Sequence, residues 1–182
     1  MVINPLEFLN IEKYIEYLRL AYRVKKVYPY AKFSAERLVV LNQKLSEIKS
    51  KRGKRKYTRH LQRFVEEELT PKLKKLTYTE GKILIKLIYR QTGLTCYELV
   101  KEYRNSFQAI IFQTTARLFK MSLKTEYQPE SNHEDFLIED ILIRAFNTGE
   151  LEELTLEVDY DYFEIADKWK AYQKKDGIFK FN

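Results

Sequence analysis

Residues 76–120 read LTYTEGKILIKLIYRQTGLTCYELVKEYRNSFQAIIFQTTARLFK, and this stretch decides the fold. Thr77 and Glu80 have the spacing of a capping box, in which each side chain accepts a hydrogen bond from the backbone amide of the other residue. Apolar residues then recur at helical spacing up to Thr92. Gly93 stands where a helix end requires a left-handed residue. The pattern therefore predicts a helix that begins after Thr77 and ends near Thr92.

A second helix is expected directly after the first. Thr95 and Glu98 repeat the capping-box spacing so soon after Gly93 that the two helices must form an αα-hairpin. Apolar residues continue in steps of three and four up to Leu118, which predicts a helix of about 24 residues, roughly 36 Å long. We interpret this second helix as the central core helix of an all-α fold.

The composition agrees with a single helical domain over residues 1–182. A chain of 182 residues is long enough to bury a substantial core. It has 14 Tyr and 11 Phe but only 5 Gly and 4 Pro, so residues that break helices are rare. The single cysteine excludes a disulfide within the chain. No apolar run reaches the roughly 20 residues that a membrane-spanning helix requires, and residues 1–9 are too short for a leader peptide.

Two helices are expected before residue 50. Asn4 and Asn10 are both candidate caps for the first helix, which we expect to stop before Pro29 because proline disfavours helical geometry in the preceding residue. Two neighbouring apolar stripes run along this helix, so we expect it to be wedged between other elements. After a sharp bend at Tyr28, a second helix is expected from Tyr30 to about Lys49.

The last third of the chain predicts helices and a minor β element. Ser131 and Glu134 form another capping-box spacing, which opens a helix that ends before Gly149. Residues 154–160 alternate apolar and polar side chains, as a strand does. A last helix follows, and residues 178–182 are placed to pair with that strand.

Charge is distributed unevenly along the chain. Residues 1–90 hold 22 Lys and Arg against 9 Asp and Glu (+13), whereas residues 91–182 hold 11 against 17 (−6). Residues 126–167, here called the acidic segment, contain 14 acids and a single base, Arg144. Residues 49–59, here called the basic arm, contain no acid at all. The two ends of this charge gradient are candidate contact surfaces.

The basic arm is the predicted binding site. Gly53 is expected to break the arm, and a helix is expected to follow from about Lys54 to Leu69. Tyr and Arg are enriched at protein interfaces because they bury a large area with little loss of rotamer freedom. The predicted partner-binding residues are accordingly Lys49, Lys51, Arg52, Lys54, Arg55, Lys56, Arg59, Tyr28 and Tyr30.

Three kinds of partner remain open for the basic arm. The first is a protein, which we expect, and the second is the acidic segment of the same chain or of a second copy. The third is RNA or another nucleic acid, bound by release of counterions from its phosphates. Within the arm only Tyr57 is placed to stack on a base, and no nucleic-acid-binding motif accompanies it.

We expect no catalytic residue, cofactor or metal. Cys96 lies at a capped helix start, where a thiol pKa can fall, but it also continues the apolar stripe and is expected to pack in the core, as is His60. His133 and the acids after it, through Asp140, fit the start of a helix, where acids complement the helix dipole. The sequence has no second histidine at ligand spacing from His133.

Three stretches carry a family resemblance: VKKVYPYAK (24–32), KLKKLTYTEGKILIKLIYRQTGLTCYELVKEYR (72–104) and ARLFKMSLKTEY (116–127). Together they resemble a domain-of-unknown-function family found in Bacteroidota, over about residues 18–150, which leaves residues 151–182 as an extension. The resemblance implies the periplasm or cell envelope, because relatives usually begin with an export signal, or the cytoplasm if the chain has no leader. It further implies an accessory role in the secretion and gliding machinery of that phylum. We therefore expect a non-enzymatic protein-binding or assembly module.

Overall fold

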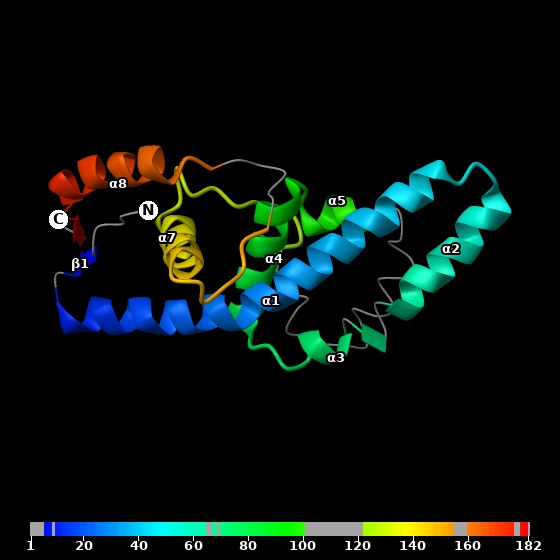
Figure 1. Cartoon of the computed structure of the whole chain (residues 1–182), viewed down its shortest axis with the longest axis horizontal. Coiled ribbons are helices and arrows are strands. Elements are labelled where there is room, and N and C mark those ends of the chain that lie inside the picture. The colour runs from blue at the N-terminus through cyan, green and yellow to red at the C-terminus, as the bar shows by residue number, and fades with distance from the viewer. Residues whose placement is uncertain are drawn as a thin grey trace. The chain divides into compact units, whose positions relative to one another are not determined.

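The computed structural model describes residues 6–8, 10–64, 67–68, 70–100, 122–154, 160–176 and 179–181. The fold is mostly helical, as predicted (Figure 1). The elements in chain order are β1 (Leu6–Phe8), α1 (Ile11–Glu47), α2 (Lys51–Phe64), α3 (Thr70–Leu73), α4 (Tyr78–Thr92), α5 (Cys96–Val100), α7 (His133–Asn147), α8 (Tyr162–Asp176) and β2 (Phe179–Phe181).

The chain divides into two compact units, which are described separately. The first unit comprises residues 1–26 and 127–182, and the second unit comprises residues 27–126. Among the described helices, none is long and apolar enough to cross a membrane.

Helix α1 differs from the prediction. It runs unbroken from Ile11 to Glu47 with Pro29 inside it, so the expected stop before Pro29 and the bend at Tyr28 are wrong. An interior proline costs about 3 kcal/mol, because it lacks an N–H group and crowds the carbonyl four residues earlier. Burial of apolar side chains on both sides of the proline offsets this cost. These side chains are Val24, Val27, Tyr28, Ala31 and Ala35.

The helix starts follow side-chain caps. Helix α1 begins at the second candidate cap, where the Asn10 side-chain oxygen accepts from the Lys13 amide at 2.9 Å. Helix α7 begins one residue later than predicted, because Asn132 rather than Ser131 is its cap and accepts from the Asp135 amide at 3.1 Å. Local sequence therefore identified the region of each start but not always the capping residue.

The minor β element joins the two ends of the described chain. Strands β1 and β2 pair antiparallel, with Leu6 opposite Phe181 and Phe8 opposite Phe179. The C-terminal tail therefore forms a strand as expected, but its partner lies near the N-terminus. Residues 155–159, the centre of the expected partner strand, lie outside the described residues.

The first helix of the predicted hairpin is confirmed. The Thr77 hydroxyl accepts from the Glu80 amide at 3.3 Å, and the Glu80 carboxylate accepts from the Thr77 amide at 2.8 Å. Gly93 ends α4 with a left-handed φ of 65°. The residues between the two caps therefore form one helix, with the bounds that the sequence indicated.

The second helix of the hairpin is confirmed where it is described. The Glu98 carboxylate accepts from the Thr95 amide at 2.8 Å, and the Thr95 hydroxyl accepts from the Glu98 amide at 3.1 Å, so the second capping box is formed. The expected continuation beyond Val100 falls outside the described residues.

Helix α4 is more deeply buried than its charges suggest. Its cations repeat every four residues, which predicts a charged stripe beside the apolar face. Lys82 is exposed, but Lys86 and Arg90 are 7% and 1% exposed. Two of the three cations are therefore buried rather than part of a charged surface stripe, and that part of the prediction is wrong.

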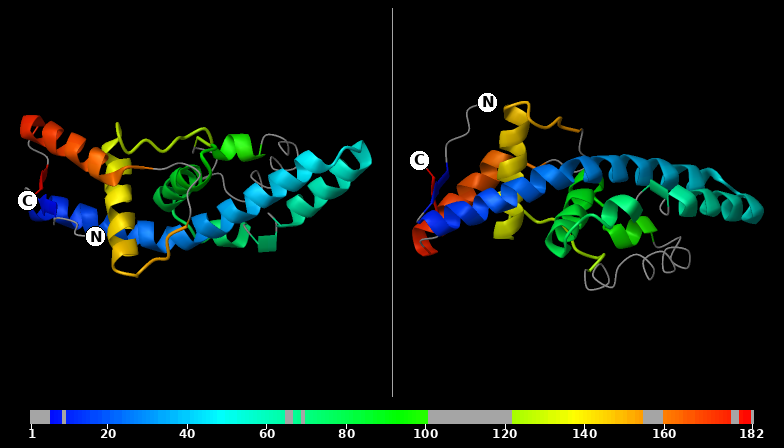
Figure 2. Two further views of the ribbon diagram at one scale, coloured as in Figure 1. Left: turned by 45° about the horizontal axis from the view of Figure 1, so that its top comes forward. Right: turned by 90° about the horizontal axis from the view of Figure 1, so that it is seen from below.

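In the first unit, α7 lies between α8 and the beginning of α1 (Figure 1). Both views of Figure 2 show α7 crossing these two helices at a steep angle. The core between α7 and α8 contains Phe136, Tyr162 and Ile165, with Trp169 stacked on Phe136 at 5.7 Å between ring centroids. The crossing places polar residues of all three helices near one point on α7.

Candidate functional site

The basic arm forms the beginning of a helix. Helix α2 starts at Lys51 and continues through Gly53, so the predicted break at Gly53 and the start near Lys54 are wrong. The Ser50 hydroxyl accepts from the Gly53 amide at 3.0 Å and caps the helix. A Cβ atom at Gly53 would lie 2.7 Å from both Ser50 Oγ and Ile48 Cγ2, so a larger residue there would displace the Ser50 and Ile48 side chains.

All seven predicted cations of the basic arm are exposed, namely Lys49, Lys51, Arg52, Lys54, Arg55, Lys56 and Arg59. Within the part of the chain that the structure describes, none of these side chains has an ion pair or a hydrogen bond. Because no described carboxylate forms an ion pair with them, these cations are available to an anionic ligand. Helix α2 runs beside the C-terminal part of α1 (Figures 1 and 2).

Four arginines share one face of α2. At about 100° per residue they fall within an arc of about 80°, and they extend for roughly 16 Å along the helix. Lys51 and Lys56 border this arc. We call the set the arginine face; it consists of Arg52, Arg55, Arg59 and Arg63, all of them exposed. Arg63 lies outside the predicted site, although the helix expected from about Lys54 already places it on the same face as Arg55 and Arg59. Only the place of Arg52 on this face depends on the helix continuing through Gly53.

The tyrosines near the basic arm do not join its surface. Tyr57 is half-buried on the other side of α2, where burial, followed by the charge of Glu47, raises its pKa. Tyr28 is 1% exposed and belongs to the core of the second unit, whereas Tyr30 is half-buried. We therefore assign Tyr28 to packing and leave it out of the binding surface.

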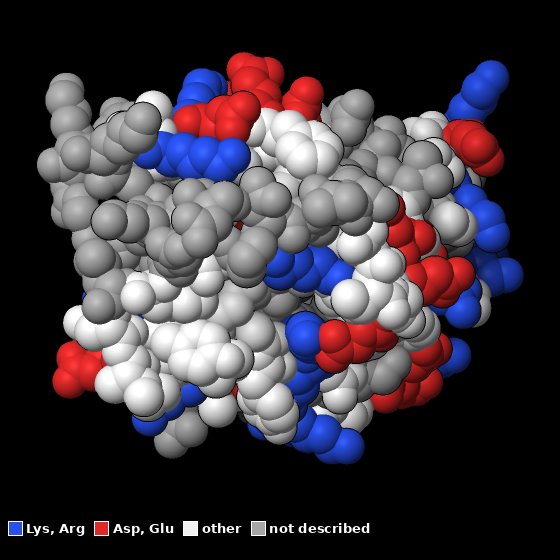
Figure 3. Space-filling view, turned by 60° about the vertical axis from the view of Figure 1, so that its left-hand side comes forward, with Lys and Arg blue, Asp and Glu red and all other residues white. Residues whose placement is uncertain are grey.

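The acidic segment finds cations within its own unit. Ion pairs join Glu150 to Lys25 at 2.6 Å, Glu130 to Lys168 at 3.1 Å, Asp167 to Lys170 at 2.9 Å and Asp140 to Arg144 at 2.9 Å. Figure 3 shows acidic and basic side chains mixed on one face. Exposed pairs of this kind contribute at most about 1 kcal/mol each. Local pairing nevertheless lowers the number of free carboxylates that the acidic segment offers to the basic arm.

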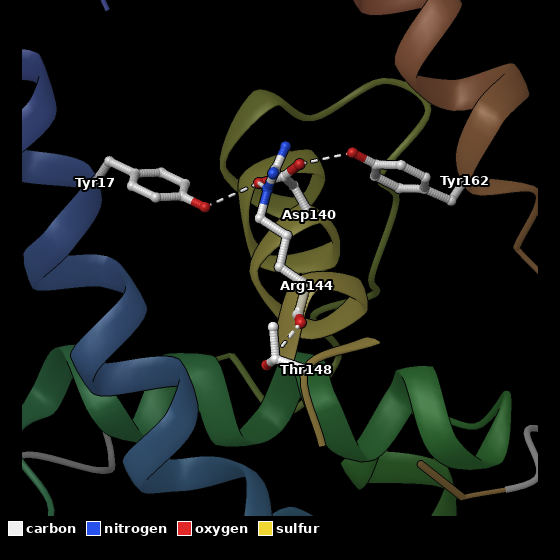
Figure 4. A network of polar contacts seen from close by, with 5 residues as sticks. All are labelled: Tyr17, Asp140, Arg144, Thr148 and Tyr162. Carbon is white, nitrogen blue, oxygen red and sulfur yellow. Dashed lines mark hydrogen bonds and ion pairs between the residues drawn. The ribbon is translucent and has the colours of Figure 1, made fainter. Parts of the chain in front are cut away.

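The first unit contains a buried polar cluster, which we call the Asp140 network (Figure 4). The Asp140 carboxylate is fully buried; its Oδ2 accepts from Tyr17 Oη and Arg144 Nε, each at 2.9 Å, and its Oδ1 accepts from Tyr162 Oη at 2.6 Å. The network thus ties α1, α7 and α8 to one carboxylate. A buried charge is tolerated only when it is paired and hydrogen-bonded, and three donors meet that condition here.

The ionisable partners of Asp140 respond to burial and to its charge. Burial raises the pKa of Tyr17 and of Tyr162, and the Asp140 carboxylate raises both further. Burial alone would lower the pKa of Arg144, but its hydrogen bond to Asp140 and the charge of Asp140 outweigh this effect and raise it. Both tyrosines therefore keep their protons well above the usual range and act as hydrogen-bond donors rather than as bases.

A second buried contact fixes the loop before α7. The Tyr127 hydroxyl lies 2.8 Å from a Glu139 carboxylate oxygen and 2.9 Å from the Asp135 carbonyl oxygen. The Asp135 carboxylate accepts from the Gln128 amide at 2.9 Å. The helix-start interpretation of the acids holds for Asp135, but Glu139 and Asp140 lie deeper in α7 and are fully buried. The interactions of Glu139 with Tyr127 of the preceding loop, and of Asp140 with Tyr17 and Tyr162, follow from no local spacing rule.

The candidate nucleophile and the candidate metal ligands lie in surroundings that do not form a catalytic or metal site among the described residues. Cys96 is buried as predicted, and burial raises its thiol pKa to about 12 rather than lowering it. His60 is exposed, so its expected place in the core is wrong. His133 lies 5.0 Å from Trp169 between ring centroids, and burial, followed by the charge of Lys13, lowers its pKa. Among the described residues no group of three or more His, Cys, Asp or Glu side chains could hold a metal ion.

Comparison with known families gives one match. The model of a domain of unknown function, DUF4294, matches residues 1–144, and the chain therefore belongs to this family. The match ends within α7, so α8 and β2 lie beyond it. No curated protein and no solved structure matches the chain.

Proposed function

We propose that this member of the DUF4294 family is a non-enzymatic protein-binding module that assembles with an acidic partner protein through the arginine face of α2. The observation that carries the proposal is the row of exposed cations on one helix, which form no ion pair among the described residues. A planar guanidinium binds a carboxylate through two parallel hydrogen bonds, so a row of arginines favours a surface rich in Asp and Glu.

The chemically reactive side chains support a binding role rather than catalysis. The Cys96 thiol is buried with a raised pKa, and Asp140 is fully buried and accepts three hydrogen bonds. Neither group is accessible to a substrate. The setting that we propose is the Bacteroidota cell envelope, with an accessory role in secretion or gliding, and this part rests on the family resemblance of the sequence alone.

Nucleic acid is the competing class of partner, because phosphates also bind arginine. Sequence-tolerant binding of single strands needs exposed aromatic rings on which bases stack. Tyr57, the aromatic residue of the basic arm, is half-buried on the other side of α2. The arrangement of the helix therefore favours a protein partner.

The test is affinity purification of the tagged chain from its native host, with and without nuclease, followed by mass spectrometry. The variant Arg52→Gln/Arg55→Gln/Arg59→Gln removes three charges from the arginine face. Lys74→Gln/Lys75→Gln/Lys82→Gln removes three exposed charges elsewhere in the second unit and is the matched control.

We expect at least one protein that survives nuclease and high-salt controls, falls roughly tenfold in the arginine variant and is retained by the lysine variant. Recovery of ribosomes or RNA that disappears with nuclease would instead assign the face to nucleic acid. Equal losses in both variants would show that only net charge matters, and would overturn the proposed site.

A further inference from the structure

Five apolar side chains at the beginning of α1 are exposed although they repeat at helical spacing. They occupy an arc of about 100° on the helix. Their exposed fractions are 74% for Ile11, 45% for Tyr14, 40% for Ile15, 46% for Leu18 and 69% for Tyr22. We call this set the apolar stripe. Isolated exposed apolar residues are ordinary, but a continuous row of this kind marks an interaction surface.

The apolar stripe lies about a third of a turn around α1 from the packed face. Tyr17, which donates to Asp140 of α7, and the fully buried Val24 lie about 110–130° around the helix from the middle of the stripe. In Figure 1, α7 and α8 both lie on one side of this part of α1. The sequence predicts a helix wedged between neighbours. Among the described residues, Phe8 contacts the stripe at Tyr14, with 5.2 Å between ring centroids, and the five side chains of the stripe nevertheless stay at least 40% exposed.

A charged flank borders the stripe and changes sign along the helix. At about 100° per residue, its four members fall within an arc of about 60° on one side of the stripe. The acids come first and the bases follow: Glu12, Glu16, Arg19 and Arg23. Glu16 also meets Lys13 at 2.7 Å, but this pair is exposed and contributes little. We call these four residues the charged flank.

We propose that the apolar stripe is the dimer interface of this protein, and that two copies pair through it as antiparallel helices. In an antiparallel pair of identical helices, the charged flank of one helix faces the charged flank of the other, and the two flanks run in opposite directions. The acidic half of the charged flank then meets the basic half of the second copy, and the reverse contact is made at the other end. A parallel pair would bring the charged flank against the uncharged flank of the second copy.

One register satisfies both the apolar and the charged residues. Ile11, Ile15, Leu18 and Tyr22 are spaced by four, three and four residues, which is the spacing of a coiled-coil seam. When Ile11 lies beside Tyr22 of the second copy, Ile15 lies beside Leu18. In the same register Glu12 and Glu16 come within about two residues, roughly 3 Å along the axis, of the arginines of the second copy.

The length of the stripe sets the strength of the interface. It covers about three helical turns, roughly 17 Å, and the next seam position is Lys25, which is paired with Glu150. Such a contact is smaller than the roughly 1,200 Å² of a typical stable interface. The dimer is therefore reversible, with a dissociation constant on the order of 10–100 µM. This interface is independent of the arginine face on α2.

Sedimentation equilibrium of the full chain and of charge-exchanged variants tests the proposal. Arg19→Glu/Arg23→Glu makes the whole flank acidic, and Glu12→Lys/Glu16→Lys makes it basic. We expect each variant alone to associate at least roughly tenfold more weakly than the natural chain, and an equimolar mixture to regain association. Leu18→Glu should abolish the dimer, whereas Phe163→Glu, at an exposed apolar residue of α8, should leave it unchanged.

Cysteine crosslinking tests the orientation. In a Cys96→Ala background, a mixture of Ile11→Cys and Tyr22→Cys chains should form mixed disulfides, while either chain alone should form few. Efficient crosslinking of Ile11→Cys with itself would show a parallel pair and overturn the orientation. A natural chain that stays monomeric up to about 500 µM, or a dimer that Leu18→Glu does not affect, would overturn the interface itself.

Discussion

Replacing Tyr162 by phenylalanine removes one hydroxyl from the Asp140 network and keeps the ring that packs in the core. The hydroxyl donates to Asp140 Oδ1 at 2.6 Å, and no other donor to that oxygen is found among the described residues. The substitution therefore leaves one oxygen of a fully buried carboxylate without a partner. We expect the folded state to lose stability, because the unfolded state keeps its hydration.

The size of the loss follows from the charge of the acceptor. Hydrogen bonds to charged groups contribute about 1.5–3 kcal/mol, and we expect about 2 kcal/mol for Tyr162→Phe. Tyr17→Phe should cost less, about 1 kcal/mol, because Asp140 Oδ2 still accepts from Arg144 Nε at 2.9 Å. In a chain of this size each kcal/mol lowers the melting temperature by about 2–4 °C. The two variants are therefore distinguishable by calorimetry.

The assay is urea unfolding followed by circular dichroism, with Tyr22→Phe as the control. Tyr22 is 69% exposed, so loss of its hydroxyl should change the free energy of unfolding by less than about 0.5 kcal/mol. If Tyr162→Phe changes it equally little, or if Tyr17→Phe costs more than Tyr162→Phe, the arrangement of donors around Asp140 is refuted.

Two further predictions concern the second unit. Burial raises the pKa of Cys96 to about 12 from an ordinary 9.0, so the buried neutral thiol stabilises the fold fully below pH 9 and this stabilisation is lost as the pH rises toward 12. Between pH 8 and pH 10 the free energy of unfolding of the natural chain should therefore fall by about 1 kcal/mol more than that of Cys96→Ala, as measured by urea titration. An equal pH dependence of the two chains would contradict the burial of the thiol. Alanine ordinarily stabilises a helix relative to glycine, but Gly53→Ala should lower the melting temperature, because its Cβ would displace the Ser50 cap. A higher melting temperature would show that the loop before α2 has room.

Local patterns predicted the features that depend on neighbouring residues. The two capping boxes and the left-handed Gly93 are formed because each requires only a fixed spacing along the chain. Burial of Cys96 followed from its place in the row of apolar residues that it continues along its own helix. The same reasoning found most of the basic arm, since a run of cations is visible in the sequence itself.

Features that depend on distant segments were missed. Asp140 meets Tyr17, 123 residues away, and Tyr162, 22 residues away, and no spacing rule connects these positions. Arg90 was expected in a charged stripe beside the apolar face, but it is 1% exposed, which its local spacing does not indicate. Gly53 was misread because the propensity of glycine opposes a helix, whereas the side chains of Ile48 and Ser50, which precede α2, lie close to this position and favour glycine there.

Pro29 gives the sharpest test of a local rule against the observed fold. In the structure it is an exposed residue inside α1, so Pro29→Ala restores a backbone donor and removes a steric clash without disturbing the core. The helix should gain about 3 kcal/mol, less about 1 kcal/mol for the extra freedom of the unfolded chain, or about 2 kcal/mol in all. Pro71→Ala is the control, because Pro71 lies in the first turn of α3, where proline is tolerated and its loss should bring no gain. If urea unfolding instead shows that Pro29→Ala is neutral or destabilising, the proline ends a helix in solution, and the two-helix interpretation of residues 11–47 is the correct one.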